Sequence, residues 1–352
     1  MAIFVTLLFA TVIPTSFVGE ANAALNPKRR QTLLSVQGTR IVDGSGRQVD
    51  LRGVNYAGYG YDSSDATIIL HSERNYQSFA QLGFNVVRLP ICWANLEPTQ
   101  GAFNVAFLRD YVDKDIQWAK KHGLYIVLDM HQVTWAVRFG GNGAPTWAVQ
   151  QYPQTKQGKY AAIVNFWSNK TLQGHMISVW TNIASAYANE PTIAGYDIFN
   201  EPYVIDNEYV NGAYINSFYL DAVNSIRRVD PNHIVFLEPA NMDVSDVGIV
   251  NMVWSPHFYP LSFESTYSSS SFSVLESEMI SDYNKFVVQF GKPMWIGEYG
   301  AFMTDGTDAV WFHDAVTLLK QYQAGSSWWA FYGPAGSYGK TIPSSLTSAW
   351  NS

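Results

Sequence analysis

The sequence predicts an α/β fold, a single (β/α)8 TIM barrel with a short N-terminal hairpin in front of it. From Leu51 onward, short apolar runs alternate with stretches of helical periodicity. This alternation is typical of parallel strands joined by crossover helices, and eight such units close into a barrel. A second observation agrees: polar residues follow the apolar runs at their carboxyl ends, the face on which such barrels carry their functional groups.

The composition limits both the fold and the partners. The chain has 352 residues, of which 47% are hydrophobic and 14% charged, so a large core is available and disorder is disfavoured. A net charge of −7 gives no electrostatic reason to bind nucleic acid or an anionic membrane. The 15% aromatic content suits a sugar-binding cleft, because the C–H faces of sugars pack on aromatic rings.

Residues 1–23 are predicted to be a secretory signal peptide. Their apolar stretch, 3–13, is too short to span a bilayer, and Ala21-Asn22-Ala23 fits the small-residue cleavage rule. The basic start of such signals is missing, since the first cationic residue is Lys28. We expect a secreted protein with no stable membrane span.

Residues 34–50 are predicted to form the hairpin, with strands at 40–42 and 48–51 around the turn dipeptide Asp43-Gly44.

The catalytic barrel is predicted over 51–340 and a tail over 341–352. Each strand is a short apolar run, and each helix has apolar residues at helical spacing. The expected strands are 51–56, 84–89, 124–129, 194–200, 233–238, 251–257, 293–298 and 326–331. The expected helices are about 73–82, 105–122, 173–189, 211–229, 273–290 and 308–324, with a short helix possible over 244–250. Residues 332–352 show no clear last helix.

Two connections are unusually long. One runs over 131–171 and contains the loop-like cluster 140–145, and the other, 259–272, is rich in serine. In a barrel both would wall the catalytic face. The alternative fold is an open doubly wound sheet, which would need a glycine-rich phosphate loop after its first strand, and residues 54–58 lack that pattern.

Two of the apolar runs end abruptly in a glutamate, at Glu201 and at Glu298. A parallel barrel aims its strand ends at one face, so these two carboxylates would converge. Paired carboxylates beside a sugar ring are the machinery of glycoside hydrolysis. The polar residues at strand ends are Arg88, His131, Asn200, Glu201, His257, Tyr259, Glu298 and Trp329.

Six short motifs carry these residues: Arg88-Leu89-Pro90, Asp129-Met130-His131, Asn200-Glu201-Pro202, His257-Phe258-Tyr259, Gly297-Glu298-Tyr299 and the region of Trp329. With them, residues 37–335 resemble glycoside hydrolase family 5, the family of many cellulases, mannanases and endoglycoceramidases. Asn-Glu-Pro alone is a weak signal, whereas Asn-Glu-Pro at the fourth strand with a glutamate at the seventh is a specific one.

The resemblance implies a retaining mechanism, with Glu201 as the acid/base and Glu298 as the nucleophile. It further implies that Arg88 and Tyr259 hold Glu298 ionised and oriented, and that Asn200 binds the sugar 2-hydroxyl. His131 and His257 would line the site and Trp329 would stack under the sugar, with neighbouring Trp328 as the alternative for that role. The physics agrees, because carboxylates about 5 Å apart leave no room for a water between them, so one must attack the sugar itself.

The substrate is less sharply indicated. We expect a β-linked oligo- or polysaccharide, with cleavage of internal bonds in β-1,4-glucan as the first candidate. The second is a glycosyl lipid, because 128–132, 138–141 and 143–149 look more like endoglycoceramidases. Those enzymes usually carry a C-terminal β-sandwich, for which this chain has no room. An alternative of another class is that the protein is a non-catalytic carbohydrate-binding barrel. Candidate sugar platforms are Trp93, Trp135, Trp147, Trp167 and Trp254.

No cofactor or metal is expected. The seven histidines include no close pair such as HxH or HExxH, and the one cysteine, Cys92, lies in an apolar stretch, so neither a zinc site nor a disulfide is predicted. We expect a monomer.

Overall fold

The computed structural model describes residues 31–58, 71–205, 208–209, 211–239, 244–246, 248–302, 305–332 and 342–352. The predicted signal peptide lies outside the described residues. Within them, no helix has both the length and the apolar character that crossing a bilayer requires.

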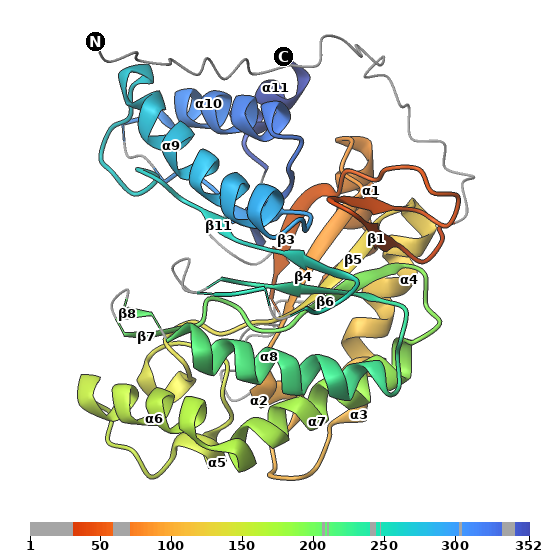
Figure 1. Cartoon of the computed structure of the whole chain (residues 1–352), viewed down its shortest axis with the longest axis vertical. Coiled ribbons are helices and arrows are strands. Elements are labelled where there is room, and N and C mark those ends of the chain that lie inside the picture. Colours follow the sequence, from red (N-terminus) through yellow and green to blue (C-terminus); the bar gives the residue numbers. More distant parts are fainter. Residues whose placement is uncertain are drawn as a thin grey trace, which may run out of the picture.

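The central sheet is parallel and forms a closed ring. Its strands lie in the middle of the molecule, with helices on both sides (Figure 1). Its strands are β3 (Arg52–Ala57), β4 (Val86–Ile91), β5 (Tyr125–Met130), β6 (Ile193–Asp197), β9 (Ile234–Leu237), β10 (Met252–Trp254), β11 (His257–Phe258), β12 (Trp295–Tyr299) and β13 (Gly325–Tyr332). They pair in the order β10-β9-β6-β5-β4-β3-β13-β12-β11.

The ring closes through a strand that is split in two. β10 and β11 stand at the two ends of the pairing order, yet they are separated in the chain only by Ser255 and Pro256. The Ser255 N–H donates to the carbonyl of Leu237 at 2.9 Å on one side, and the Pro256 carbonyl accepts from Gly297 at 3.1 Å on the other. Proline has no N–H to continue a ladder, which accounts for the break. The predicted eight-stranded barrel is therefore confirmed, with its sixth strand in two pieces.

Helices surround the strands at the predicted places. They are α1 (Glu73–Gln81), α4 (Asp113–His122), α7 (Lys170–Tyr187), α8 (Gly212–Arg227), α9 (Phe272–Asp282) and α10 (Asp308–Gln321). Two predicted helices contain π-helical segments, η1 (Leu108–Val112) before α4 and η4 (Tyr283–Gln289) after α9. In Figure 1, α7 and α8 lie on one side of the strands, together with α6 (Lys156–Ser168), and α9 and α10 lie on the other, together with α11 (Ser344–Asn351).

Two local predictions were wrong. A last helix exists, α11 (Ser344–Asn351), and the described part of 244–250 is not helical. The long 131–171 connection also holds two helices that the sequence did not indicate, α5 (Thr146–Val149) and α6 (Lys156–Ser168). Short helices draw most of their stability from tertiary packing, which a local pattern does not reveal. In α11 that packing is visible: the Trp350 ring lies 4.7 Å from the Arg52 guanidinium and its indole N–H donates to the Tyr299 hydroxyl at 3.0 Å.

The N-terminal hairpin forms one strand earlier than predicted. β1 (Ser35–Gln37) pairs with β2 (Arg40–Val42), and the predicted partner contributes only a single bridge from Gln48 to Val42. The turn places Gly38 at φ +60, a conformation that favours glycine. Both Leu34 and Ile41 pack against the apolar floor of the barrel, so the hairpin covers its amino end.

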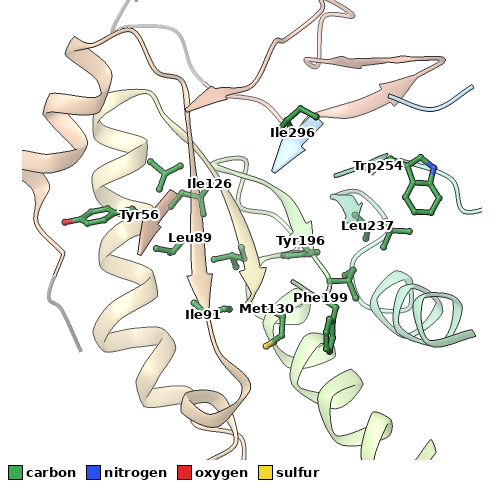
Figure 2. Packing of buried hydrophobic residues seen from close by; sticks show 14 of the residues in the cluster. Tyr56, Leu89, Ile91, Ile126, Met130, Tyr196, Phe199, Leu237, Trp254 and Ile296 are labelled. Atoms are coloured by element: carbon green, nitrogen blue, oxygen red, sulfur yellow. The ribbon is translucent and has the colours of Figure 1, made fainter. Parts of the chain in front are cut away.

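Two apolar layers hold the strands. The larger lies between the strands and the helices, and Figure 2 shows Leu89, Ile126, Tyr196 and other members projecting from neighbouring strands. The smaller fills the inside of the barrel near its amino end; its members on the strands are Val86, Val127, Ala194, Ile234, Phe236, Val253 and Trp295. Because strand side chains alternate between faces, the inward-pointing positions above this floor are fixed.

Candidate active site

Side chains two residues beyond the apolar floor point into the same interior, at the carboxyl end of the barrel. The pairs are Val86 with Arg88, Val127 with Asp129, Phe236 with Glu238, and Val253 with Ser255 followed by His257. The period of two therefore carries polar side chains from four strands into one buried layer. This layer is where the predicted site residues meet.

Arg88 is the centre of the layer and is fully buried. Its guanidinium contacts four carboxylates, Asp129 at 3.0 Å, Asp197 at 2.9 Å, Glu238 at 2.9 Å and Glu298 at 2.7 Å. It also donates to the amide oxygens of Asn55 at 3.0 Å and Asn200 at 2.9 Å. The rigid fork of a guanidinium can hold several partners at fixed positions, which a lysine cannot do.

Glu298 is the penultimate residue of β12 and has a side chain only 5% exposed. Arg88 donates to its Oε1 at 2.7 Å, and the hydroxyl of Tyr259 donates to its Oε2 at 2.9 Å. Burial and the neighbouring charge of Glu298 raise the pKa of Tyr259 well above its usual value, so this hydroxyl stays a neutral donor. Both oxygens of Glu298 are thus held in place by donors.

Glu201 follows β6 and is more open, with 34% of its side chain exposed. Its backbone has φ +44, in the left-handed region. Nδ1 of His257 lies 2.9 Å from its Oε1. Burial acts to raise the pKa of Glu201, but the hydrogen bond and positive charge of His257 outweigh it and hold this pKa below its usual value.

The pKa of His257 is shifted in the opposite direction to that of Glu201. Burial acts to lower its pKa, but the charges of Glu238 and Glu298 and the contact with Glu201 raise this pKa well above the usual histidine value. The two pKa shifts share one geometric cause, the 2.9 Å contact between Nδ1 of His257 and Glu201, and both favour a protonated His257 beside an ionised Glu201.

The two glutamates lie close together, as predicted. An oxygen of Glu201, an oxygen of Glu298 and a ring nitrogen of His257 all lie within 4.8 Å of one another. Nδ1 of His257 is 3.5 Å from Oε2 of Glu298 and so lies near both carboxylates. This separation resembles that of retaining glycosidases and falls short of the ~6.5–9.5 Å that inverting enzymes need for a water.

The remaining predicted residues lie around this pair. Trp329 is half-buried and stacks on His131 with ring centroids 5.0 Å apart, while Trp328 is buried in the core, so the geometry favours Trp329 as the sugar-facing ring. Nδ1 of His131 lies 2.8 Å from Asp129. The Asn200 amide donates to the Gln132 carbonyl at 3.0 Å, and its second N–H leaves it able to bind another acceptor.

The prediction that five tryptophans serve as sugar platforms is corrected by the structure. Four of them, Trp93, Trp135, Trp167 and Trp254, are at most 5% exposed and belong to the core, and Trp147 is partly buried against it. Tryptophans between strands and helices look the same in sequence as tryptophans in a cleft. Besides Trp329, a second aromatic surface lies beside the site, and it was not predicted.

That surface is formed by Phe263 and Phe302. Phe263 is 70% exposed and stacks face to face on Phe302, with centroids 4.9 Å apart and an interplanar angle of 6°. Its ring lies 5.6 Å from that of Tyr259, which binds Glu298. The turn that presents it has Leu261 at φ +56, and the Phe302 N–H donates to the Ser262 carbonyl at 2.9 Å. The serine-rich connection therefore holds an exposed apolar ring next to the site.

Sequence reasoning missed three buried carboxylates: Asp129 as a site member in its own right, Asp197 and Glu238. The alternation from Val127 and Phe236 would have identified two of them, because it predicts which side chains point inward. Burial raises the pKa of Asp197 well above its usual value, against the lowering effect of Arg88. Their oxygens approach one another as metal ligands do, but the guanidinium of Arg88 occupies the position of a cation among them.

Comparisons with known proteins agree with this geometry. The family model described as "Cellulase (glycosyl hydrolase family 5)" matches residues 42–333. The chain is 30% identical to the protein in a solved structure titled "Crystal structure of endogalactoceramidase", with a TM-score of 0.75, covering 85% of this chain and 74% of that one.

Two curated relatives show the range of the similarity. An endoglycoceramidase of Cyanea nozakii is 24% identical over 300 residues, which are 70% of this chain and 57% of that protein. An endoglucanase of Paenibacillus polymyxa is 23% identical over 358 residues, 90% of this chain and 83% of that protein. The chain spans little more than half the length of the first curated relatives it matches.

Proposed function

Because the chain belongs to glycosyl hydrolase family 5, and is therefore a glycoside hydrolase, we propose that it cleaves β-glycosidic bonds with retention of configuration. The observation that carries this proposal is the approach of Glu201 and Glu298 to within 4.8 Å, too close for an attacking water between them. The different surroundings of the two carboxylates support a division of roles.

Glu298 is the proposed nucleophile. It is buried, and Arg88 and Tyr259 orient both of its oxygens. One oxygen attacks the anomeric carbon while the bond from that carbon to the leaving oxygen breaks, which forms a glycosyl ester on Glu298. The loss of charge on Glu298 in this step weakens the repulsion that Glu201 feels.

Glu201 is the proposed acid/base. Its carboxylate is the more exposed of the two, as suits a group that reaches the leaving oxygen. The proton begins on His257, 2.9 Å away, and passes through Glu201 to the leaving group. In the second step Glu201 takes a proton from a water, that water attacks the anomeric carbon, and the ester bond to Glu298 breaks.

The first candidate substrate is a glycosyl lipid, cleaved between glycan and lipid. This reverses the order expected from sequence, where room for a further domain decided against it. The endoglycoceramidase and endogalactoceramidase relatives support this order. So does the stack of exposed Phe263 on half-buried Phe302, which lies beside Tyr259, the donor to Glu298. It is an apolar surface that a lipid chain next to the scissile bond would cover.

The second candidate is internal cleavage of β-1,4-glucan. The endoglucanase relative, which matches most of both chains, favours it. A screen over glycosylceramides, β-glucans, mannan and xylan separates the candidates. Release of intact glycan from a glycosylceramide supports the first, reducing ends from β-glucan support the second, and binding without product would mean a non-catalytic carbohydrate-binding barrel.

Each glutamate variant, Glu201→Gln and Glu298→Gln, is expected to lose several orders of magnitude in turnover with unchanged folding. The amide can neither donate the proton nor form the ester. Glu190→Gln is the matched control, because Glu190 lies before β6 at the opposite end of the barrel from the site and pairs with Lys120. Full activity in a Glu201→Gln, Glu298→Gln double variant would end the assignment.

The lipid assignment is tested at Phe263. Phe263→Ala removes the exposed ring and is expected to lower kcat/KM on a glycosylceramide about tenfold, while a short aryl glycoside is cleaved nearly as before. Tyr160→Ala on α6 is the control, since Tyr160 is 45% exposed and belongs to another surface. Equal rates of wild type and Phe263→Ala on the lipid substrate would contradict the placement of the lipid.

Export and a monomeric state complete the proposal. Export rests on the pattern of residues 1–23, and the presence of the protein in the culture medium of an expressing host would support it. Light scattering of the purified protein tests the monomeric state.

A further inference from the structure

Glu238 directly follows β9, and its buried carboxylate contacts Arg88, which binds Glu298, as well as His257 and the backbone of Glu201. It is 2% exposed. Its Oε2 accepts a hydrogen bond from the Glu201 backbone N–H at 2.6 Å. Its Oε1 lies 2.9 Å from Arg88 and 3.2 Å from Nε2 of His257.

The bond to Glu201 has a specific consequence. The Glu201 backbone is in the left-handed region, which costs free energy for a residue with a side chain. A charge-assisted hydrogen bond of 2.6 Å to that N–H stabilises the unusual conformation and fixes the direction of the side chain.

The contact with His257 acts on the proton. Nδ1 of His257 bonds to Glu201, and its other nitrogen faces Glu238 at an ion-pair distance without the angle of a regular hydrogen bond. A negative charge at Glu238 favours the protonated ring. Glu238, His257 and Glu201 thus form a chain in which a buried carboxylate holds a proton next to the acid/base.

Glu238 acts as a carboxylate in this arrangement. Burial raises its pKa, yet the contacts of its oxygens with Arg88, His257 and the Glu201 N–H are all contacts with donors, which suits the ionised form. The charged and titratable groups that face it are Arg88 from β4, Asp129 from β5, Asp197 from β6, Tyr219 from α8, Glu201 after β6 and His257 from β11.

We propose that Glu238 is a positioning residue for the acid/base: it holds the Glu201 backbone in place and keeps the proton on His257 available to Glu201. The inference rests on the proposed function. In this role Glu238, which follows β9, acts on the reaction through Glu201 and does not contact the substrate.

The test compares Glu238→Gln with wild type on two substrates. Gln keeps the size and loses the charge, so the pKa of the Glu201–His257 pair falls and the basic limb of the kcat/KM profile moves to lower pH by about one unit. On a substrate with a poor leaving group kcat/KM falls about ten- to a hundredfold, whereas a dinitrophenyl glycoside, which needs no proton, loses about threefold or less. The proposal would be overturned if kcat/KM fell while the basic limb of its pH profile stayed in place. It would also be overturned if kcat/KM fell equally on both substrates.

β9 offers a matched control at its other end. Asp230, before that strand, is a buried carboxylate that pairs with His233 at 2.6 Å, so Asp230→Asn removes a similar charge far from the site. It is expected to lower stability and to leave the position of the basic limb unchanged. Asp230→Asn shifting that limb as much as Glu238→Gln does would contradict a local effect.

Glu238→Asp keeps the inference testable if the Gln variant fails to fold. It keeps the charge and shortens the reach to the Glu201 N–H, so activity falls while the basic limb stays at the wild-type position. A shifted limb in Glu238→Asp would count against the charge as the cause. If wild type cleaves neither substrate, the proposed function fails; if wild type is active and Glu238→Gln behaves like Asp230→Asn, the inference alone fails.

Discussion

At the scale of single residues, the site depends on one cation among several acids. Arg88 contacts four carboxylates in a buried layer. Removing one member of such a network leaves a buried charge without its partner, which is strongly destabilising. The same guanidinium touches the proposed nucleophile and the positioning residue Glu238, so it links the two halves of the site. Its planar shape is therefore as important as its charge.

Arg88→Lys tests this point. A lysine is a single point charge that cannot reach all four carboxylates, so kcat/KM is expected to fall about a hundredfold and the free energy of unfolding by about 3 kcal/mol. Activity assays and urea unfolding measure the two effects. Arg109→Lys is the control, because Arg109 forms an exposed pair with Asp110. Near-wild-type activity in Arg88→Lys would show that charge alone suffices.

At the scale of elements, β9 carries a carboxylate and histidine contact at each end, with different consequences. At its carboxyl end Glu238 faces His257 within the proposed site. At its amino end Asp230 accepts from the Tyr196 hydroxyl at 2.7 Å and pairs with His233, remote from the chemistry. The first arrangement serves the proposed reaction and the second stabilises the barrel.

The amino-end pair predicts how stability depends on pH. Burial acts to raise the pKa of Asp230, but hydrogen bonds from His233 and Tyr196 outweigh it and lower this pKa to about 2. A lowered carboxyl pKa stabilises the fold above the unfolded value of about 4, here by about 2 kcal/mol, and this contribution is lost as pH falls toward about 2. The stability gap between wild type and Asp230→Asn should therefore shrink by about half between neutral pH and about pH 3. A gap that is constant over this range in urea unfolding would contradict the assignment.

The split sixth strand has a role at the same scale. It closes the ring through Leu237 on one side and Gly297 on the other, and it delivers His257 between the two glutamates. A break at Pro256 thus lies one residue before the histidine that contacts both. The backbone pattern and the position of the side chain are consequences of the same short segment.

At the scale of the whole molecule, the periodicity of the sequence is enough to predict the architecture. The barrel, its strand positions and the meeting of residues such as Glu201 and Glu298 are all consequences of alternating apolar runs with polar ends. Glu238 obeys the same rule, two residues after Phe236, but it belongs to none of the motifs that carried the resemblance. Asp197 was hidden because the apolar run continues through Ile198 and Phe199 beyond the end of β6.

The features that the sequence did not predict depend on contacts between distant segments. α11 is held by the contacts of Trp350 with Arg52 and Tyr299, which are far away in the chain. Phe263 is exposed because a strained turn and Phe302 support it, and no local pattern separates such a ring from the buried Trp254. Packing decides these cases, and packing is a property of the folded molecule.

The central claim is that the closed ring brings Glu298 to the anomeric carbon as a nucleophile. The most direct test is intact-mass and peptide analysis after incubation with an activated aryl 2-deoxy-2-fluoro-β-glycoside, which slows hydrolysis of the glycosyl ester. We predict that one glycosyl group is added on Glu298 and that Glu298→Gln shows no adduct. An enzyme that hydrolyses its β-glycoside substrates but carries its adduct on another residue, or releases product with inverted configuration, would contradict the account.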